Sequence, residues 1–348
     1  MSENLVFPDA RPRSELRPKG TSFPGLVGVE LRRLWWRRLA KAALVAVVIF
    51  TAASVYNAYT ASAPERLAQQ LDEYRHMVEQ TPRMIEDCEK QQAQERDRSG
   101  DPSIDFGCDQ QKAPTLDDMG LVLPLADTIS VSITKIGALL LAFVSLLLGA
   151  SLVGAEFSTG SMGTWLTFQP RRLRVAASKL VAAALGGAAV AAVGLVLANL
   201  GARMVSTVNR PGDDLQLPAP PALEDPLAVL GLRVVAIAVG AGLIGACLGL
   251  LLRHTAATIG VVLAFAVVVE GIAVQSFFQG RLQRWSVLHN LEAFVEKGST
   301  YFAETCTASG CQYGPQTLTY THGWVFLLCV VAVVVLAGLV SFRRRDVA

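Results

Sequence analysis

The chain has 348 residues, of which 52% are hydrophobic and only 17% are charged, and its mean hydropathy is +0.40. Soluble domains carry about 25% charged residues, so this composition excludes a typical cytosolic enzyme and a disordered chain. The formal net charge of +2 is too small to indicate a nucleic-acid-binding protein.

Six apolar runs are long enough to cross a membrane as helices, which requires about 20 residues each. They are residues 41–61, 131–153, 180–202, 227–252, 256–278 and 323–342. The first run resembles a secretory signal, because basic residues precede it and Ala61-Ser62-Ala63 follows it. A signal core has only about 7–15 residues, so we interpret this run as an uncleaved first span. The sequence therefore predicts an all-α membrane protein with six transmembrane helices.

The Lys and Arg residues indicate how these spans are oriented. With an even number of spans, both termini lie on the same side as residues 154–179 and 253–255. That side carries 17 basic and six acidic residues, against 14 basic and 23 acidic residues in the rest of the chain. Cytoplasmic segments are enriched in Lys and Arg, so we expect both termini in the cytoplasm.

The segment before the first span divides into a cytoplasmic tail, residues 1–22, and an amphipathic helix, residues 23–40. In the helix, Arg and Trp side chains interleave with apolar residues. We expect it to lie on the inner leaflet, with Arg near lipid phosphates and Trp among the headgroups. The residues predicted to contact the membrane interface are Arg32, Arg33, Trp35, Trp36, Arg37 and Arg38.

The first outer segment, residues 62–125, is too long for a simple connection and is net acidic. Its apolar residues recur every three or four positions over residues 64–98, which predicts a pair of amphipathic helices with Pro82 near the turn. We interpret the segment as an extracellular lid that is either simply solvated or a docking surface for a cationic ligand or partner. A proline-rich linker, residues 206–226, forms the second outer segment.

The last outer segment, residues 279–322, contains a helical apolar pattern over residues 279–297. This pattern predicts a short amphipathic helix at the outer interface, anchored by Trp285.

Four cysteines lie in the predicted outer segments, where disulfides persist. Cys88 and Cys108 belong to the first outer segment, and Cys306 and Cys311 belong to the last. Four cysteines allow three pairings. Our hypothesis is local pairing, Cys88 with Cys108 and Cys306 with Cys311.

Charged residues within or beside spans are costly and mark candidates for a substrate path. They are Asp127, Lys135, Arg203, Arg233 and Glu270. The alternative is ion pairing within the protein or snorkelling toward the membrane surface. Glu270 is the deepest by position and the strongest candidate.

Glycines in the fourth span, among them Gly245 and Gly249, permit close helix packing. This seam lies either within one subunit, which we expect, or between subunits.

The predicted cytoplasmic segment 154–179 carries apolar side chains that can form one exposed face, followed by Pro170 and basic residues. An exposed apolar patch of this kind is typical of a protein docking surface.

This segment also carries a family pattern: Glu156-Phe157, Gly160-Ser161, Leu166, Pro170-Arg171-Arg172 and Ser178-Lys179-Leu180. The pattern resembles the membrane subunits of ABC-2 type transporters. The order of features agrees along the chain, from an N-terminal helix with Glu30 and Arg32 to the outer helices before the last span. Two positions depart from the pattern. Gly163 stands where a helix-favouring basic residue is common, and Arg172 lacks the usual preceding serine.

The resemblance implies a type V exporter fold, with residues 41–348 as the six-span permease domain and residues 279–322 as extracellular re-entrant or interfacial helices, of which 279–297 are the re-entrant ones. Two permease subunits, two copies or a copy and a paralogue, would each bind an ATPase. Residues 156–168 would include the coupling helix. The residues implied in ATPase coupling are Glu156, Phe157, Gly160, Met162, Trp165 and Leu166. Replacing Glu156 or Trp165 is expected to uncouple ATP hydrolysis from export without unfolding.

The sequence contains no G-x-x-x-x-G-K-[ST] motif for ATP phosphates and no metal-spaced His/Cys cluster. We therefore expect a non-enzymatic chain without its own cofactor or metal, with ATP and Mg²⁺ bound by the ATPase partner. The expected role is export of a hydrophobic or amphipathic substrate across a bacterial plasma membrane. The alternatives are a membrane sensor or scaffold and a secondary transporter, neither of which needs an ATPase.

Overall fold

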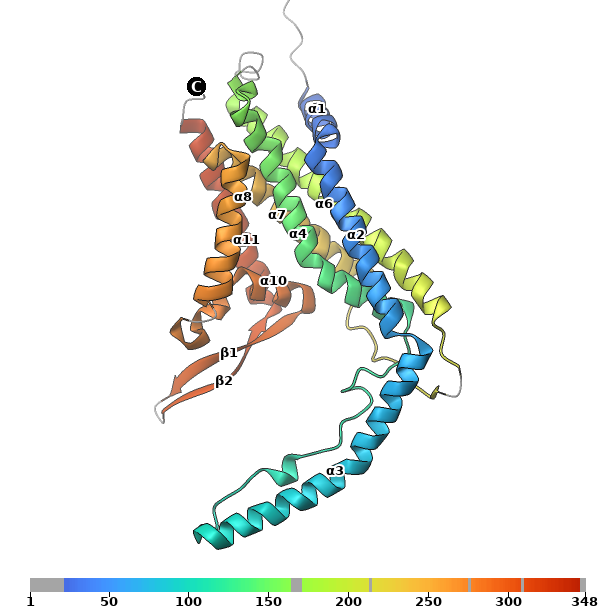
Figure 1. Cartoon of the computed structure of the whole chain (residues 1–348). Helices are drawn as coiled ribbons and strands as arrows, with labels where there is room; N and C mark the ends of the chain where they lie inside the picture. The colour runs from blue at the N-terminus through green and yellow to red at the C-terminus, as the bar shows by residue number, and fades with distance from the viewer. Residues whose placement is uncertain (1–21, 164–170, 213–214, 275–276, 308–309, 345–348) are drawn as a thin grey trace, which may run out of the picture.

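The computed structural model describes residues 22–163, 171–212, 215–274, 277–307 and 310–344. Within these ranges six helices are long and apolar enough to cross a membrane. They are α2 (Arg38–Ala61), α4 (Ala126–Ser158), α6 (Arg172–Val208), α7 (Leu227–Leu252), α8 (Thr255–Ala264) with its continuation η4 (Phe265–Ala273), and α11 (Tyr320–Arg344). Each of them overlaps one predicted span, which confirms the helical membrane fold (Figure 1).

Close packing of α4, α6 and α7 forms the centre of the bundle, and glycines permit it. A Cβ on Gly245 of α7 would lie 1.9 Å from the carbonyl oxygen of Leu146 on α4. A Cβ on Gly149 of α4 would lie 2.1 Å from the carbonyl oxygen of Gly242 on α7. The glycine seam of the fourth span therefore lies within the subunit.

The N-terminal helix α1 (Phe23–Trp36) begins where the side chain of Ser22 accepts a hydrogen bond from the backbone N–H of Gly25. It ends one turn earlier than predicted, because Arg37 has an extended backbone and α2 begins at Arg38. Helix α1 packs against α6 through a buried stripe that includes Leu26 and Leu34.

The first outer segment contains one helix of 36 residues, α3 (Pro64–Ser99), so the predicted helix pair is wrong. Pro82 lies inside α3, where it removes one backbone donor without ending the helix. The beginning of α3 is packed, with Leu67 and Leu71 against Leu121. Figure 1 shows α3 curving away from the bundle. The chain returns through the short 3₁₀ helix η2 (Cys108–Gln110).

The last outer segment departs from the predicted helices. It begins with a 3₁₀ helix, η5 (Phe278–Trp285), and α10 (Val287–Glu296), and ends with an antiparallel hairpin of β1 (Gly298–Thr307) and β2 (Gly310–Thr319). The prediction of helices is therefore wrong over 298–319. The strands contain β-branched and aromatic residues, which favour extended backbone. The hairpin lies at the same end of the molecule as α3 (Figure 1).

Both hypothesised disulfides are present. Cys88 on α3 bonds Cys108 on η2, with the Cα atoms 5.8 Å apart. Cys306 and Cys311 are directly opposite in the β1–β2 register, and their bond closes the hairpin. Each outer projection is thus covalently braced.

Candidate functional site

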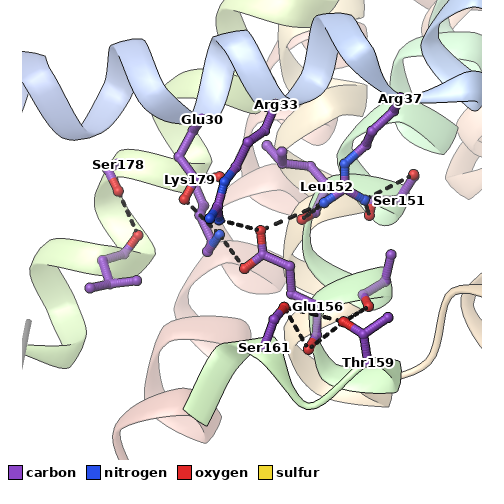
Figure 2. A network of polar contacts seen from close by, with 12 residues as sticks. Glu30, Arg33, Arg37, Ser151, Leu152, Glu156, Thr159, Ser161, Ser178 and Lys179 are labelled. Carbon is purple, nitrogen blue, oxygen red and sulfur yellow. Dashed lines mark hydrogen bonds and ion pairs between the residues drawn. The ribbon is translucent and has the colours of Figure 1, made fainter. Parts of the chain in front are cut away.

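A buried ionic cluster joins α1, α4 and α6 near the end of the bundle where the segment 154–179 begins (Figure 2). Its centre is Lys179 on α6, whose side chain is 1% exposed. The Nζ atom of Lys179 donates a hydrogen bond to Glu30 Oε1 at 2.8 Å and to Glu156 Oε2 at 2.6 Å. The three residues belong to three helices, so the cluster connects segments up to 149 positions apart in the sequence.

The local sequence explains why these charges are buried. Glu30 lies four residues from both Leu26 and Leu34, on the face of α1 that is buried. Glu156 lies in the last turn of α4 among small and apolar residues. A buried charge is tolerated when it is paired, and removing one partner of a buried pair costs about 3–5 kcal/mol. The cluster therefore holds the three helices in one relative arrangement.

Two arginines extend the cluster toward its exposed edge. Arg33 Nη1 lies 3.5 Å from Glu156 Oε1, and Arg37 Nη2 lies 3.6 Å from the same atom. Arg37 also donates hydrogen bonds to the carbonyl oxygens of Ser151 and Leu152 on α4. Burial lowers the pKa of Arg37, and the carboxylates of Glu156 and Glu30 oppose that shift.

The predicted membrane-interface residues thus divide into two groups. Arg37 is turned inward to α4, and Arg33 contacts Glu156 with a side chain that is 43% exposed. The prediction that Arg37 serves lipid phosphates does not fit its position, whereas Arg33 stays exposed and its contact with the membrane remains a prediction. Arg32, Arg38, Trp35 and Trp36 are exposed, as a contact with the membrane surface requires.

The residue after Glu156 contacts the other side of the bundle. The ring of Phe157 meets the ring of Phe342 on α11 edge to face, with centroids 6.3 Å apart. The guanidinium carbon of Arg253, between α7 and α8, lies 5.5 Å from the centroid of the Phe157 ring. Two consecutive residues at the end of α4 therefore contact α1, α6, α11 and the residue between α7 and α8.

The end of α4 is capped by its own next residues. Thr159 Oγ1 donates to the carbonyl oxygen of Ala155 at 2.9 Å, and Ser161 Oγ donates to that of Glu156 at 3.4 Å (Figure 2). Gly160 has a φ of +70°, a left-handed conformation that favours glycine.

The six residues implied in ATPase coupling differ in accessibility. Glu156 and Met162 are buried, Phe157 is half-buried and Gly160 is exposed. Trp165 and Leu166 lie outside the described residues. Because Glu156 is 4% exposed and ion-paired, its replacement should disturb folding, contrary to our expectation from the sequence.

The candidates for a substrate path are mostly engaged within the protein. Glu270 in η4 is 3% exposed, and its carboxylate accepts hydrogen bonds from Ser286 Oγ and from the backbone N–H of Val287 at 2.7 Å. It therefore caps the first turn of α10. Lys135 Nζ lies 3.4 Å from Glu296 Oε2.

Arg233 is also a structural residue. It forms an ion pair with Asp225, donates to the carbonyl oxygen of Val295 at 3.2 Å, and stacks over Tyr320. Lys297 Nζ lies 2.9 Å from Asp225 Oδ1, and this contact is the main cause that lowers the pKa of Asp225. The contacts of Lys135 and Arg233 agree with the alternative that these charges form ion pairs within the protein. Asp127, by contrast, is exposed at the start of α4.

One group of metal-type ligands occurs among the described residues, Glu304 with Cys306 and Cys311. The two sulfurs are joined in a disulfide, and Arg281 contacts both Glu304 and Cys306. The positive charge of Arg281 and the bond between the two sulfurs do not fit a metal site, because metals bind thiolates and not disulfide sulfurs.

A comparison with known proteins shows the family of the chain. A family model described as ABC-2 family transporter protein matches residues 27–347. The chain belongs to this family. No curated protein matches it. The match and the six apolar helices indicate a multi-pass membrane component of an ABC transporter, a type of chain that is not itself catalytic and that associates with an ABC ATPase.

Sequence reasoning did not predict that Glu30, Glu156 and Lys179 meet. All three appear in the ABC-2 pattern, but only as separate matches. The available signal was Lys179 itself, a single cation at the start of a span that otherwise contains small and apolar residues.

Proposed function

We propose that this chain is the transmembrane permease subunit of an ATP-driven exporter in a bacterial plasma membrane. A separate ATPase binds ATP and Mg²⁺ and docks against the segment 156–168. Two permease subunits, two copies of this chain or one copy and a paralogue, form the path for a hydrophobic or amphipathic substrate. The alternative is a membrane sensor or scaffold, or a secondary transporter.

The observation that carries this proposal is the double connection at the end of α4. Glu156 is bound to α1 and α6 through Lys179, Glu30, Arg33 and Arg37. A packed, ion-paired cluster of this kind transmits displacement as a unit, because interiors are close-packed and not freely deformable.

Phe157 completes the connection toward α7, α8 and α11 through Arg253 and Phe342. A force applied by an ATPase to the residues just after α4 would therefore reach both sides of the bundle at once. In this mechanism Glu156 is a positioning residue inside the protein, and the ATPase contacts the exposed residues that follow it.

The first experiment is purification from native membranes in mild detergent, with mass spectrometry of the proteins that remain bound. We expect a stoichiometric ATPase with a Walker A motif. A homo-oligomer without an ATPase in several detergents would overturn the proposal in favour of the sensor, scaffold or secondary transporter.

The second experiment tests coupling with Phe157→Ala in proteoliposomes that contain the ATPase. We expect ATP hydrolysis to become insensitive to the permease, while the complex still assembles. The matched control is Phe302→Ala, which removes a ring that is 52% exposed on the outer hairpin. Equal effects of the two variants would contradict the role given to Phe157.

A further inference from the structure

A second polar site lies at the other end of the bundle, in a groove between α4, α6 and α7. The groove is open to the surroundings and has a volume of about 500 Å³, within the size range of small-ligand sites. Its walls are mainly apolar, including Leu195, Gly231 and Val235, and three uncharged polar side chains interrupt them: Ser130, Thr134 and Asn199.

One polar atom in this groove has no partner. Ser130 is 1% exposed, and its Oγ forms no hydrogen bond with any described residue. An unsatisfied buried hydroxyl costs about 1–3 kcal/mol. A ligand with a hydrogen-bond acceptor or donor at this depth would remove that cost.

The depth of the groove can be worked out from helix lengths. Helix α4 has 33 residues and α6 has 37, which at about 1.5 Å per residue gives roughly 50 and 55 Å. The hydrocarbon layer is about 30 Å thick, so each helix extends roughly 10–13 Å beyond it at both ends if centred. Ser130, Thr134 and Asn199 lie about 6, 12 and 14 Å from the ends of their helices nearest α3. They therefore lie near the boundary between hydrocarbon and headgroups, where glycerolipids carry their ester groups.

Two charged residues continue the walls of the groove outward by one turn. Asp127 precedes Ser130 by three residues on α4, and Arg203 follows Asn199 by four residues on α6, so each shares a helix face with its neighbour. Both side chains are exposed, and neither forms an ion pair with a described residue. The groove thus has one anionic and one cationic group at headgroup depth.

We infer that this groove binds a zwitterionic glycerophospholipid of the leaflet nearest α3. The acyl chains lie against the apolar walls, the ester groups meet Ser130 and Asn199, the phosphate meets Arg203 and the ammonium meets Asp127. The exposed apolar wall of the groove supports a lipid ligand, because Leu232, which lines it, is 69% exposed. The site does not depend on an ATPase, so its test is independent of the proposed function.

The test uses the purified chain in nanodiscs with two photoactivatable lipids, phosphatidylethanolamine and phosphatidylglycerol, each with a diazirine in the acyl chain. Mass spectrometry then locates the labelled peptides. We expect phosphatidylethanolamine to label α4, α6 and α7 beside the groove at least fivefold more than the exposed face of α2. Even labelling of all exposed faces would overturn the inference.

Two glycine variants form a matched pair. A Cβ on Gly231 would lie 3.5 Å from Leu195 Cδ1, an ordinary contact distance, so a larger side chain can start there and fill the groove. A Cβ on Gly260 would have no atom within 4 Å. Gly231→Phe should reduce groove labelling at least fivefold, and Gly260→Phe should leave it unchanged. Equal labelling in the two variants would reject the site.

The headgroup assignment is tested with Asp127→Asn. In the native protein we expect phosphatidylethanolamine to label the groove several-fold more than phosphatidylglycerol, and the variant should lose this preference. Equal labelling of the native protein by both lipids would overturn the assignment.

The competing occupant is a second copy of the chain. Leu232→Cys in a Cys329→Ala background should give no disulfide-linked dimer in membranes. Efficient dimer formation would show that protein covers the groove, and would overturn the lipid site.

Discussion

Replacement of Lys179 by methionine tests the buried cluster most directly. Glu30 is 1% exposed, and its Oε1 atom forms an ion pair with Lys179. The Oε2 atom of Glu30 has no hydrogen-bond partner among the described residues. Glu156 keeps Arg33 and Arg37. The cost of Lys179→Met therefore falls mainly on Glu30, and removing one partner of a buried pair costs about 3–5 kcal/mol. At about 1.4 kcal/mol per tenfold change, the ratio of folded to unfolded protein falls roughly 10²- to 10³-fold or more.

The double variant Glu30→Leu/Lys179→Met gives the decisive comparison. Replacing a buried ion pair by apolar residues is often nearly neutral, so we expect the double variant to be more stable than Lys179→Met alone. The assay is thermal unfolding in detergent, followed by size-exclusion chromatography of the fraction that stays monodisperse. The control is Lys135→Met, which breaks a pair whose side chains are 36% and 40% exposed and should cost at most about 1 kcal/mol. The reasoning fails if Lys179→Met is no more harmful than Lys135→Met, or if the double variant is no better than the single one.

Two further predictions concern packing and pH. Gly245→Ala should lower the apparent Tm strongly, because its Cβ would lie 1.9 Å from a backbone oxygen of α4. Gly260→Ala should leave the Tm unchanged, because its Cβ would contact nothing. Thermal unfolding of both variants tests this, and equal Tm values would contradict close packing of α4 and α7 at Gly245. The Lys297 contact lowers the pKa of Asp225 below its ordinary value of 3.8. The ionised carboxylate therefore stabilises the folded state at pH values above 3.8. This stabilisation is lost as the pH falls through the folded-state pKa. The Tm difference between native protein and Asp225→Asn should therefore be constant from about pH 7 to pH 5 and shrink below about pH 4; a difference that shrinks near pH 6 would point to another group.

The six spans were predictable because each depends on local composition alone. A run of about 20 apolar residues has few alternatives to a membrane helix. The two disulfides were also predictable, since each joins cysteines close in sequence, 20 and five positions apart.

The outer segments were less predictable, because their structure depends on competing weak signals. Pro82 suggested a turn, but α3 continues through it with Thr81 Oγ1 donating to the carbonyl oxygen of Met77 at 2.7 Å. Residues 298–319 carry no strict alternation, since the hairpin is exposed on both faces along much of β2. A strand without a buried face leaves little pattern in the sequence.

The ionic cluster could not be predicted from local pattern. The resemblance to ABC-2 permeases implied a role for Glu156 in ATPase coupling, and nothing in the local sequence showed that this side chain is buried. Its burial results from pairing with Lys179 and with side chains from α1, which precedes it by more than one hundred positions. Contacts of this range are decided by tertiary packing.

The length of α4 has a mechanical consequence. Helix α4 is continuous over 33 residues, or about 50 Å at 1.5 Å per residue, and its two ends carry the Glu156 contacts and the first residues of the groove. A rigid rod of about this length that tilts by roughly 5° about one end moves its other end by about 4 Å. A small rotation at the ion cluster would thus become, at the far side of the membrane, a displacement comparable to the diameter of a water molecule or more.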